Sequence, residues 1–451
     1  MRRWRGLKAL VHEAVDRTVD LVYEGHESTA RNVLRVTDVA DATREPARAV
    51  DAIRRLGTRG VLGTIKAVNR AVEVVTDAGL DVAEARFGQR DAPSLIRAVP
   101  LRSDVLKTAD WLGDAGLGLV NAALGDHLHA KENGLDLGMS FRVGDHYVRT
   151  LDRATLVRAL PAPSPRVVLF VHGLGTTEWS WVLEAQAYHG DPSATFGSLL
   201  ARDVGVTPVW LRYNSGRHVS TNGRLLAREL ERFVDAYPIP IEELVLVGHS
   251  MGGLVVRSAC HYGSESGARW VSLVRRVVSL GAPHRGAPLA KLGAVLTTVL
   301  GAIDLPGTLV TSRVLEGRSA GIKDLRHGSL VDEDWLGKDP DALDSPGAKD
   351  IALLPDVTYS FVSATITRDP EHPLGRLIGD LLVRVPSSAG PTVQSRAFPI
   401  ETDHFGGVMH HELQNHPGIY EVVRDAVKNG PSATAVGIIT SPTPPFVILR
   451  P

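Results

Sequence analysis

The sequence predicts an α/β fold with a mostly parallel central sheet that helices cover on both faces. Short, uninterrupted apolar runs recur after residue 165, helical stretches separate them, and residues 245–253 join one run to a helix through a tight turn. Strands that are buried on both faces of a parallel sheet have this continuous apolar composition. A chain of 451 residues is also longer than one typical domain, so we expect an additional region beside this core.

The composition excludes several classes of function. Apolar residues make up 43% of the chain, charged residues 22%, and the formal net charge is -1, so nothing indicates a nucleic-acid partner. Cys260 is the single cysteine, and we interpret it as a buried, inert thiol. The sequence contains no H-E-x-x-H, no Cys/His cluster with metal spacing, no P-loop and no complete G-x-G-x-x-G, so we expect neither a metal nor a cofactor.

The N-terminal part has the apolar periodicity of helices, and Ser103 is the expected N-cap of a helix from Asp104 to Ala123. Four cations lie in the first eight residues, and no apolar signal-peptide segment follows them, so we expect a cytoplasmic protein. A basic amphipathic helix can make peripheral contact with an anionic membrane. Packing of a helical subdomain against the core is the alternative that we favour.

Composition shifts divide the chain into segments. A Gly144-Asp145 turn predicts a hairpin, and three prolines at 161–165 mark a linker. A block that breaks the strand–helix alternation is expected to be an inserted cap or lid. The predicted segments are a helical N-terminal region (1–135), a hairpin and Pro-rich linker (136–165), the α/β domain (166–430) with its cap or lid (286–354), and a C-terminal tail (431–451). The predicted strands are 167–171, 208–213, 244–247, 277–280, 357–364 and, more weakly, 393–399. The pattern indicates no oligomeric state.

The segment from Val245 to Gly253 (VLVGHSMGG) runs from an apolar strand through a G-x-S-x-G turn into a helix. Gly248 and Gly252 allow close backbone approach, so Ser250 can occupy a strained turn at the strand end. The N-terminus of the following helix favours negative charge that develops there. With a strand before it and a helix after it, the motif predicts a nucleophile rather than a structural Gly-Ser turn.

A second glycine-rich turn follows the strand in Val167–Gly175 (VVLFVHGLG). With a nucleophile elbow, the oxyanion hole takes one backbone N–H from such a loop and another from the residue after the nucleophile. These donors would be the amides of Leu174 and Met251. We interpret His172 as a hydrogen-bonding residue that shapes the loop, because it precedes the serine and belongs to the oxyanion strand.

The general base should follow the serine and the acid in chain order. The last part of the predicted domain holds four histidines, and spacing alone does not choose between them: His404, His410, His411 and His416. The acid that orients the base is expected after the strand that ends near Ala364. Asp380 is the candidate there. Asp369 and Glu371 are alternatives, although each lies in a Pro-flanked polar turn that suits a solvated carboxylate.

These motifs together resemble the lipase and esterase branch of the α/β hydrolases, and in particular its members similar to GPI inositol-deacylases and bacterial triacylglycerol lipases. FVHGLG (170–175) is similar to the family's oxyanion strand, and VGHSMGGLVVRSA (247–259) is similar to its elbow and the helix that follows. SLGAPHRGAPLAKLG (279–293) is similar to the segment that leads into the lid. The resemblance covers about residues 166–428 and implies an α/β-hydrolase fold.

The resemblance also implies a base and an acid. Family members often have a histidine three residues before a Leu-Leu-Asn-His-Pro run, and the run Leu413–Pro417 points to His410, with Gln414 as a departure. GDLLVRVPSS (379–388) is similar to the family's acid segment and implies Asp380, with Leu381 in place of a glycine.

We therefore expect a serine carboxylic-ester hydrolase that acts on an acyl-ester or lipid substrate. The same machinery would serve a thioesterase, an amidase or a glycolipid deacylase, and a membrane-associated interaction protein is a further alternative. Trp179 and Trp181 follow the oxyanion loop and are candidates for lining the acyl pocket, although core packing explains them equally well. The apolar stretch Leu289–Ile303 is expected to be a cap helix or a mobile lid.

Overall fold

The computed structural model describes residues 5–13, 94–105, 108–287, 319–338, 351–365 and 400–428, and the single positions 3, 16, 20, 70 and 349. The chain divides into two compact units, one formed by residues 1–92 with 130–135 and the other by 93–129 with 136–451. In the smaller unit residues 5–13 are helical, and the side-chain amide of Asn133 donates a hydrogen bond of 3.0 Å to the Gly6 carbonyl. In the described part of the chain, no helix is long and apolar enough to cross a membrane.

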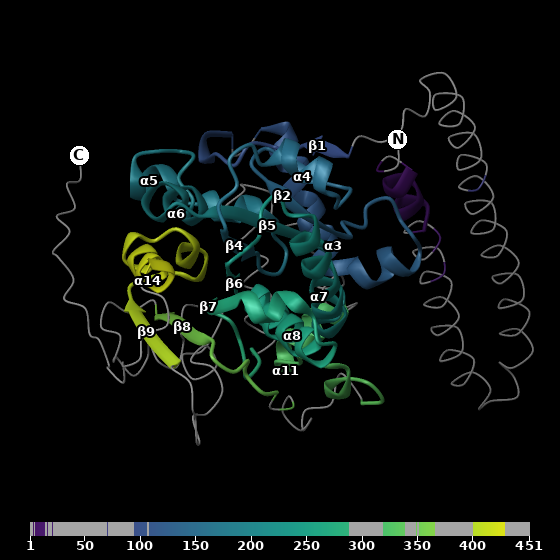
Figure 1. Ribbon diagram of the computed structural model, residues 1–451. Helices are drawn as coiled ribbons and strands as arrows, with labels where there is room; N and C mark the ends of the chain where they lie inside the picture. Colours follow the sequence, from purple (N-terminus) through teal and green to yellow (C-terminus); the bar gives the residue numbers. More distant parts are fainter. Residues whose placement is uncertain are drawn as a thin grey trace, which may run out of the picture. The chain divides into compact units, whose positions relative to one another are not determined.

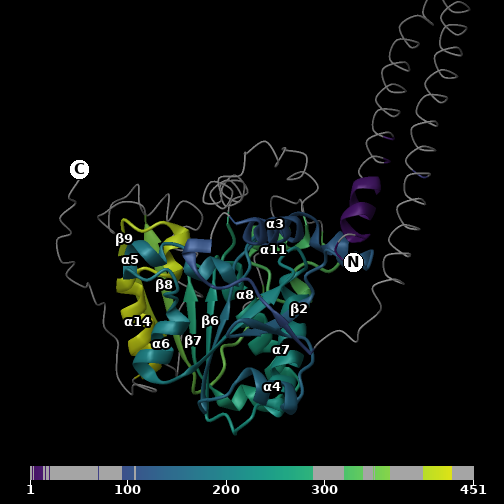
Figure 2. The ribbon, with the colours of Figure 1, turned by 90° about the horizontal axis from the view of Figure 1, so that it is seen from above.

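The described strands of the larger unit form one sheet with the order β1-β3-β2-β5-β4-β6-β7-β8-β9 (Figures 1 and 2). Every pair of neighbours from β5 to β9 is parallel, whereas β2 joins β5 in the antiparallel sense and β3 and β1 extend that edge. The strands are β1 (Leu95–Arg97), β2 (Met139–Val143), β3 (His146–Val148), β4 (Arg166–Val171), β5 (Thr207–Tyr213), β6 (Glu243–His249), β7 (Val274–Leu280), β8 (Thr358–Thr365) and β9 (Ile400–Gly406). The predicted α/β class with a mostly parallel sheet is confirmed.

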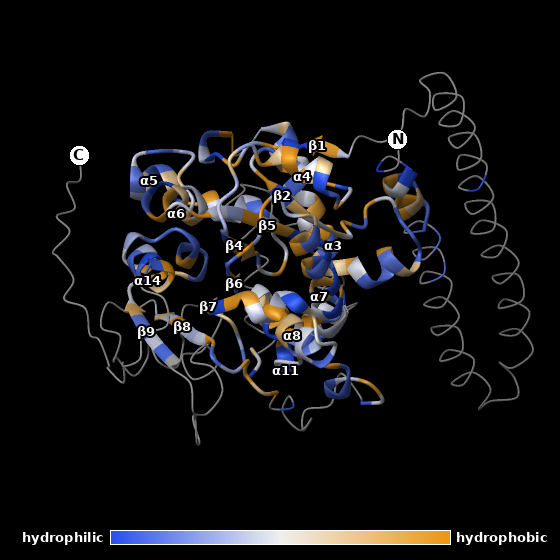
Figure 3. Cartoon of the chain, in the orientation of Figure 1, coloured by the Kyte–Doolittle hydropathy of each residue, from blue (hydrophilic) through white to orange (hydrophobic). Residues whose placement is uncertain are grey.

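Helices cover both faces of this sheet, so each central strand is buried on two sides (Figure 2). Along β4, Val167, Leu169 and Val171 join the core that α7 and α8 cover, whereas Val168 and Phe170 join the core under α6 and α14. Hydrophobic residues accordingly gather along the central strands (Figure 3). The α-helices are α3 (Ala109–Ala130), α4 (Arg153–Ala159), α5 (Ala185–His189), α6 (Phe196–Val204), α7 (Val219–Ala236), α8 (Met251–Glu265), α11 (Ala320–His327) and α14 (Pro417–Lys428). The 3-10 helices are η1 (Ser103–Val105), η2 (Glu178–Val182), η3 (Arg269–Leu273), η5 (Asp332–Asp334) and η6 (His410–Gln414).

Some details differ from the sequence prediction. The α-helix expected from Asp104 begins at Ala109, because Thr108 accepts from the Trp111 N–H at its start (3.4 Å). This helix, α3, belongs to the larger unit rather than to a separate N-terminal region, and the predicted hairpin is β2–β3, which is part of the main sheet. The last strand begins at Ile400, and the weaker predicted strand at 393–399 lies outside the described residues.

The predicted cap lies between two neighbouring strands of the sheet, β7 and β8. Its described part contains α11 and η5, and the stretch Leu289–Ile303 lies outside the described residues. Cys260 is buried within α8, and burial raises the pKa of its thiol to about 12, which agrees with an inert cysteine.

Candidate active site

Ser250 lies at the carboxyl end of β6, on the edge of a parallel sheet where ligands bind in folds of this kind. Its backbone angles are φ 53° and ψ -124°, a conformation that residues with a Cβ rarely adopt, and its N–H donates to the Leu280 carbonyl at the end of β7 (2.8 Å). Helix α8 starts at the next residue. The strand, sharp turn and helix predicted around Ser250 are all present, and the turn stores strain of about 1–3 kcal/mol.

The two glycines of the motif make this turn sterically possible. A Cβ on Gly252 would lie 2.3 Å from the Val171 carbonyl oxygen and 2.6 Å from that of His172. A Cβ on Gly248 would lie 2.6 Å from the Cα of Gly253. Helix α8 therefore begins in direct backbone contact with the end of β4, which places the nucleophile turn beside the predicted oxyanion loop.

The predicted oxyanion loop packs directly against the serine. A Cβ on Gly173 would lie 3.1 Å from the Cβ of Ser250. The Leu174 amide belongs to the peptide group that follows Gly173, and the Met251 amide follows the serine. Among the turn, loop and cap hydrogen bonds of the described residues, none uses the amide of Leu174 or Met251 as its donor.

His172 shapes this loop through both ring nitrogens. Nε2 accepts from the Tyr213 N–H (3.3 Å), so Nδ1 is protonated and donates to the Gly173 carbonyl (2.9 Å). The Tyr213 hydroxyl donates in turn to the His172 carbonyl (3.0 Å), and the two rings stack with centroids 4.4 Å apart. Burial lowers the pKa of His172 to about 4, so the ring is neutral near neutral pH and acts as a structural hydrogen-bonding group.

His410 lies close to the strand end that holds the serine. It begins η6 and is 5% exposed. A Cβ on Gly281 would lie 3.1 Å from both Nδ1 and Cε1 of its ring, and Gly281 directly follows Leu280, the residue that accepts from the Ser250 N–H. His410 follows Ser250 by 160 positions in the sequence. The structure thus brings it to the edge of the sheet that presents Ser250.

His249 is a residue whose role the sequence analysis missed. Its Nε2 donates to the His410 carbonyl (3.0 Å), and the two imidazole rings pack with centroids 4.6 Å apart. Burial and the neighbouring His410 hold the pKa of His249 well below its ordinary value, so the ring stays neutral. The sequence does show His249 as a polar side chain at the end of a buried strand. It occupies the position before the serine in G-x-S-x-G, which the motif leaves variable.

The other three histidines occupy different surroundings. His404 lies within β9 and its Nδ1 is 2.7 Å from the Ser363 hydroxyl. Burial lowers the pKa of His411, which is next to His410 in η6. His416 accepts from the Gly418 N–H (3.2 Å) at the start of α14, the helix-cap position expected for it. His410 is the member of the four that packs against His249 and approaches Gly281.

All three candidates for the acid lie outside the described residues: Asp380, Asp369 and Glu371. Strand β8, after which the acid is expected, ends at Thr365, close to the predicted end. The assignment of Asp380 therefore stays a prediction.

A family model described as the alpha/beta hydrolase family matches residues 168–414, more than half of the chain. The chain belongs to the alpha/beta hydrolase family. The matched residues include both Ser250 and His410. No curated protein matches this hydrolase in sequence.

Several solved structures are similar to this hydrolase. The mature lipase BlEst2 of Bacillus licheniformis has 17% identity and a TM-score of 0.38, over 59% of this chain and 94% of the lipase. A lipase-esterase related protein of Clostridium acetobutylicum has 16% identity and a TM-score of 0.31, over 59% and 94% of the two chains. The Pyrococcus furiosus esterase Pf2001 has 13% identity and a TM-score of 0.32, over 60% and 82%.

Both tryptophans after the predicted oxyanion loop are buried by packing. Trp181 is fully buried in the core cluster under α6 and α14, with its ring against Phe170 at 5.0 Å. Trp179 is 3% exposed and packs edge-on against Trp111 of α3, also at 5.0 Å. Core packing accounts for these contacts of both side chains in the hydrolase, and a role in an acyl pocket stays a prediction.

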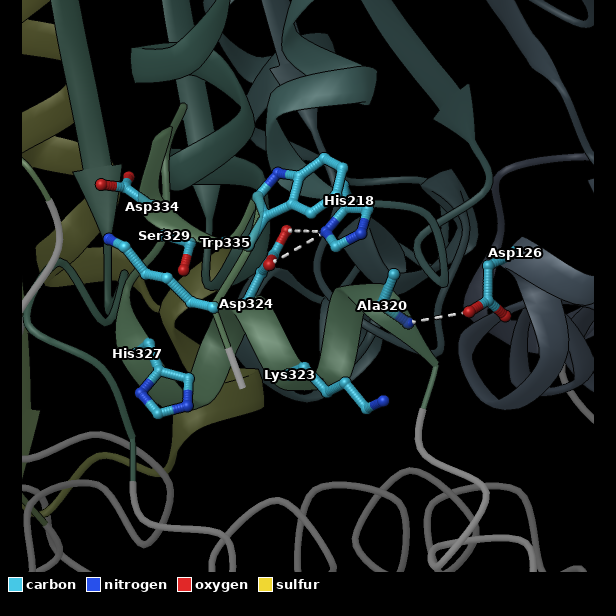
Figure 4. Close-up of a pocket in the computed structure, with 10 residues that line it drawn as sticks. Asp126, His218, Ala320, Lys323, Asp324, His327, Ser329, Asp334 and Trp335 are labelled. Atoms are coloured by element: carbon cyan, nitrogen blue, oxygen red, sulfur yellow. Dashed lines mark hydrogen bonds and ion pairs between the residues drawn. The ribbon is translucent and has the colours of Figure 1, made fainter. Parts of the chain in front are cut away.

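A cavity of about 190 Å³ is lined by one face of α11, which carries Ala320, Lys323 and Asp324 (Figure 4). On one wall His218 stacks on Trp335 at 3.6 Å, and its Nδ1 is 3.1 Å from both oxygens of Asp324. Neither Ser250 nor His410 lines this cavity. On a different side of α11, a Cβ on Gly321 would lie 3.0 Å from the Cε of Met251. The cavity is therefore separated by one helix from the residue that follows the candidate nucleophile.

Proposed function

We propose that this alpha/beta hydrolase is a serine carboxylic-ester hydrolase. The observation that most supports the proposal is the strained backbone of Ser250, which lies at a strand end with the Gly173 backbone against its Cβ. Strain of this kind persists where the surrounding structure imposes it, and it is concentrated at functional sites. Ser250 also differs from an ordinary left-handed turn residue of the same chain: Glu184 has φ 60° and ψ 9°, whereas Ser250 has φ 53° and ψ -124°.

In the proposed reaction the Ser250 hydroxyl attacks the ester carbonyl while His410 removes its proton. The amides of Leu174 and Met251 donate to the oxyanion of the tetrahedral intermediate. His410 then protonates the leaving alcohol, and a water molecule that it activates releases the acid from the acyl-enzyme. Asp380 is the carboxylate proposed to orient the imidazole and to stabilise its cation.

The neighbours of Ser250 suit this chemistry. Helix α8 directs its N-terminus at the position where negative charge develops. Among the described residues, no turn, loop or cap hydrogen bond has the amide of Leu174, in the adjacent loop, or of Met251 as its donor. His249 holds the His410 backbone by a hydrogen bond and stays neutral, so it supports the base without competing for the proton. Removal of one oxyanion donor typically costs about 3 kcal/mol of transition-state stabilisation.

The proposal is tested by replacing the nucleophile. We expect Ser250→Ala to lose hydrolysis of p-nitrophenyl butyrate and labelling by a fluorophosphonate probe, while far-ultraviolet circular dichroism and the unfolding midpoint show an intact fold. Ser264→Ala is the matched control, because Ser264 is an exposed serine on the same helix, and it should keep full activity. Ester turnover that survives in purified Ser250→Ala would refute the assignment.

The type of bond is tested separately. A butyryl ester, a butyryl thioester and a butyryl anilide share the acyl group and differ in the leaving group. The proposal expects the largest kcat/KM for the ester. A larger value for the thioester or the anilide, lost in Ser250→Ala, would keep the nucleophile and change the assignment to a thioesterase or an amidase.

A further inference from the structure

A buried ionic cluster lies immediately after the oxyanion loop. Glu178, which begins η2, is 1% exposed, and its carboxylate accepts from Arg212 through two bonds of 2.9 Å. It also accepts from the Tyr147 hydroxyl (2.6 Å) and from Arg142 (3.3 Å). Burial alone would raise the pKa of Glu178, but the charges of Arg212 and Arg142 outweigh burial and bring it to about 2. The Glu178 carboxylate is therefore ionised near neutral pH.

Helix α3 supplies the second carboxylate of this cluster. Asp114 is 7% exposed and binds Arg212 with both oxygens, at 2.6 and 2.5 Å. The Thr177 hydroxyl, one residue before Glu178, donates to Asp114 at 3.0 Å. Arg212 comes from β5, so its two carboxylate partners connect α3 and the segment after the predicted oxyanion loop through one strand.

The same helix touches the oxyanion loop with its backbone. A Cβ on Gly118, one turn after Asp114, would lie 3.0 Å from the Gly175 carbonyl oxygen. Gly175 in turn donates its N–H to the Ser215 hydroxyl (3.2 Å) in the loop after β5. The loop is thus held between α3 and β5 along residues 175–178.

A buried ion pair is weak evidence for stability, because apolar residues of the same volume often stabilise a core as well. What a bidentate carboxylate–guanidinium pair adds is fixed geometry. Here the fixed geometry lies at residues 177–178, four and five positions after Gly173, whose backbone packs against the Cβ of Ser250. A small displacement there would be transmitted to the predicted oxyanion donor, and misplacement by about 1 Å can lower a rate about 100-fold.

We propose that Asp114 is a positioning residue for the oxyanion loop. Through Arg212 and Thr177 it holds the loop at the distance from Ser250 that oxyanion stabilisation requires. Helix α3, which precedes the family-matched residues 168–414, is then part of the catalytic unit. This inference rests on the proposed function, because it assumes that Ser250 passes through an oxyanion intermediate.

The test is Asp114→Asn in the full chain, which keeps the shape of the side chain and removes its charge. We expect kcat for p-nitrophenyl butyrate, normalised to active sites by burst titration, to fall by about 10- to 100-fold with KM changed by less than about threefold. The inhibition constant of a butyl boronic acid, whose serine adduct carries an oxyanion, should rise by the same factor as kcat falls. Asp110→Asn is the matched control, because Asp110 is exposed on the same helix, and it should behave as wild type.

A second variant covers the case in which Asp114→Asn does not fold. Thr177→Val keeps the shape of the side chain and removes the hydroxyl that donates to Asp114, and we expect the same pattern with a smaller loss of kcat. If folded Asp114→Asn and folded Thr177→Val both keep wild-type kcat per active site, the inference is wrong while the proposed function stands. If the wild-type chain neither hydrolyses the ester nor reacts with a fluorophosphonate, the proposed function itself fails.

Discussion

Replacement of Gly252 by alanine should disable the nucleophile turn without touching a chemical group of the site. The new Cβ would lie 2.3 Å from the Val171 carbonyl oxygen and 2.6 Å from that of His172. Both obstacles are backbone atoms, so no side chain can rotate away. Relief of the contact requires the start of α8 to move away from β4 by about 1 Å, since ordinary contact begins near 3.4 Å.

This displacement would move Ser250 and the Met251 amide relative to the oxyanion loop. We therefore expect kcat for p-nitrophenyl butyrate to fall about 100-fold, which corresponds to about 2.7 kcal/mol in the barrier. Overpacking of the same contact should lower the free energy of unfolding by about 1–3 kcal/mol. Steady-state kinetics, normalised to folded protein, and denaturant unfolding measure the two effects.

Gly113→Ala in α3 is the matched control, because a Cβ there meets nothing within 4 Å. Alanine in an exposed helix interior should leave kcat unchanged and raise the free energy of unfolding by up to about 1 kcal/mol. The steric reasoning is refuted if Gly252→Ala keeps kcat within about twofold of wild type. It is also refuted if the two alanine variants lose activity equally.

Two further predictions follow from buried side chains. Burial lowers the pKa of His172 from 6.5 to about 4, so between these pH values the unfolded chain binds a proton that the folded chain does not. The free energy of unfolding should therefore fall by about 3 kcal/mol as the pH is lowered through this window. Urea unfolding at several pH values measures this slope, and an unchanged slope in His172→Asn would contradict the assignment of the proton to this ring. Trp181 is fully buried in the core, so Trp181→Ala should lower the free energy of unfolding by about 3–5 kcal/mol. A stable Trp181→Ala with altered acyl-chain preference would instead favour the pocket role.

Local sequence pattern was sufficient to predict the parallel sheet and the turn at Ser250. Strand β6 is buried on both faces, so its sequence is an uninterrupted apolar run, and the glycines that flank Ser250 are required by contacts within a few residues of the motif or with the neighbouring strand. Patterns of this kind depend on residues that are close in the chain, so they can be recognised from the sequence alone.

The partners of the serine depended on contacts between distant parts of the chain. Sequence spacing did not decide which of four histidines is the candidate base. The hydrogen bond that holds the His410 backbone comes from His249, 161 residues earlier. A resemblance to a family pointed to the same histidine, but the residue that supports it occupied a position that the motif treats as variable. The acid Asp380 still rests on the resemblance alone, because it lies outside the described residues.

The sequence by itself determined the fold class, the turn at Ser250 and the chain order of the candidate catalytic residues. Burial of a strand and the geometry of a turn depend mainly on residues that are close in the sequence. Tertiary structure decided that α3 belongs to the larger compact unit and that Asp114 meets Arg212 across 98 residues. An isolated aspartate in a helix has the same local pattern whether it is solvated or paired. The pairing depends on which strand end the folded chain brings beside it, and that is a property of the assembled sheet.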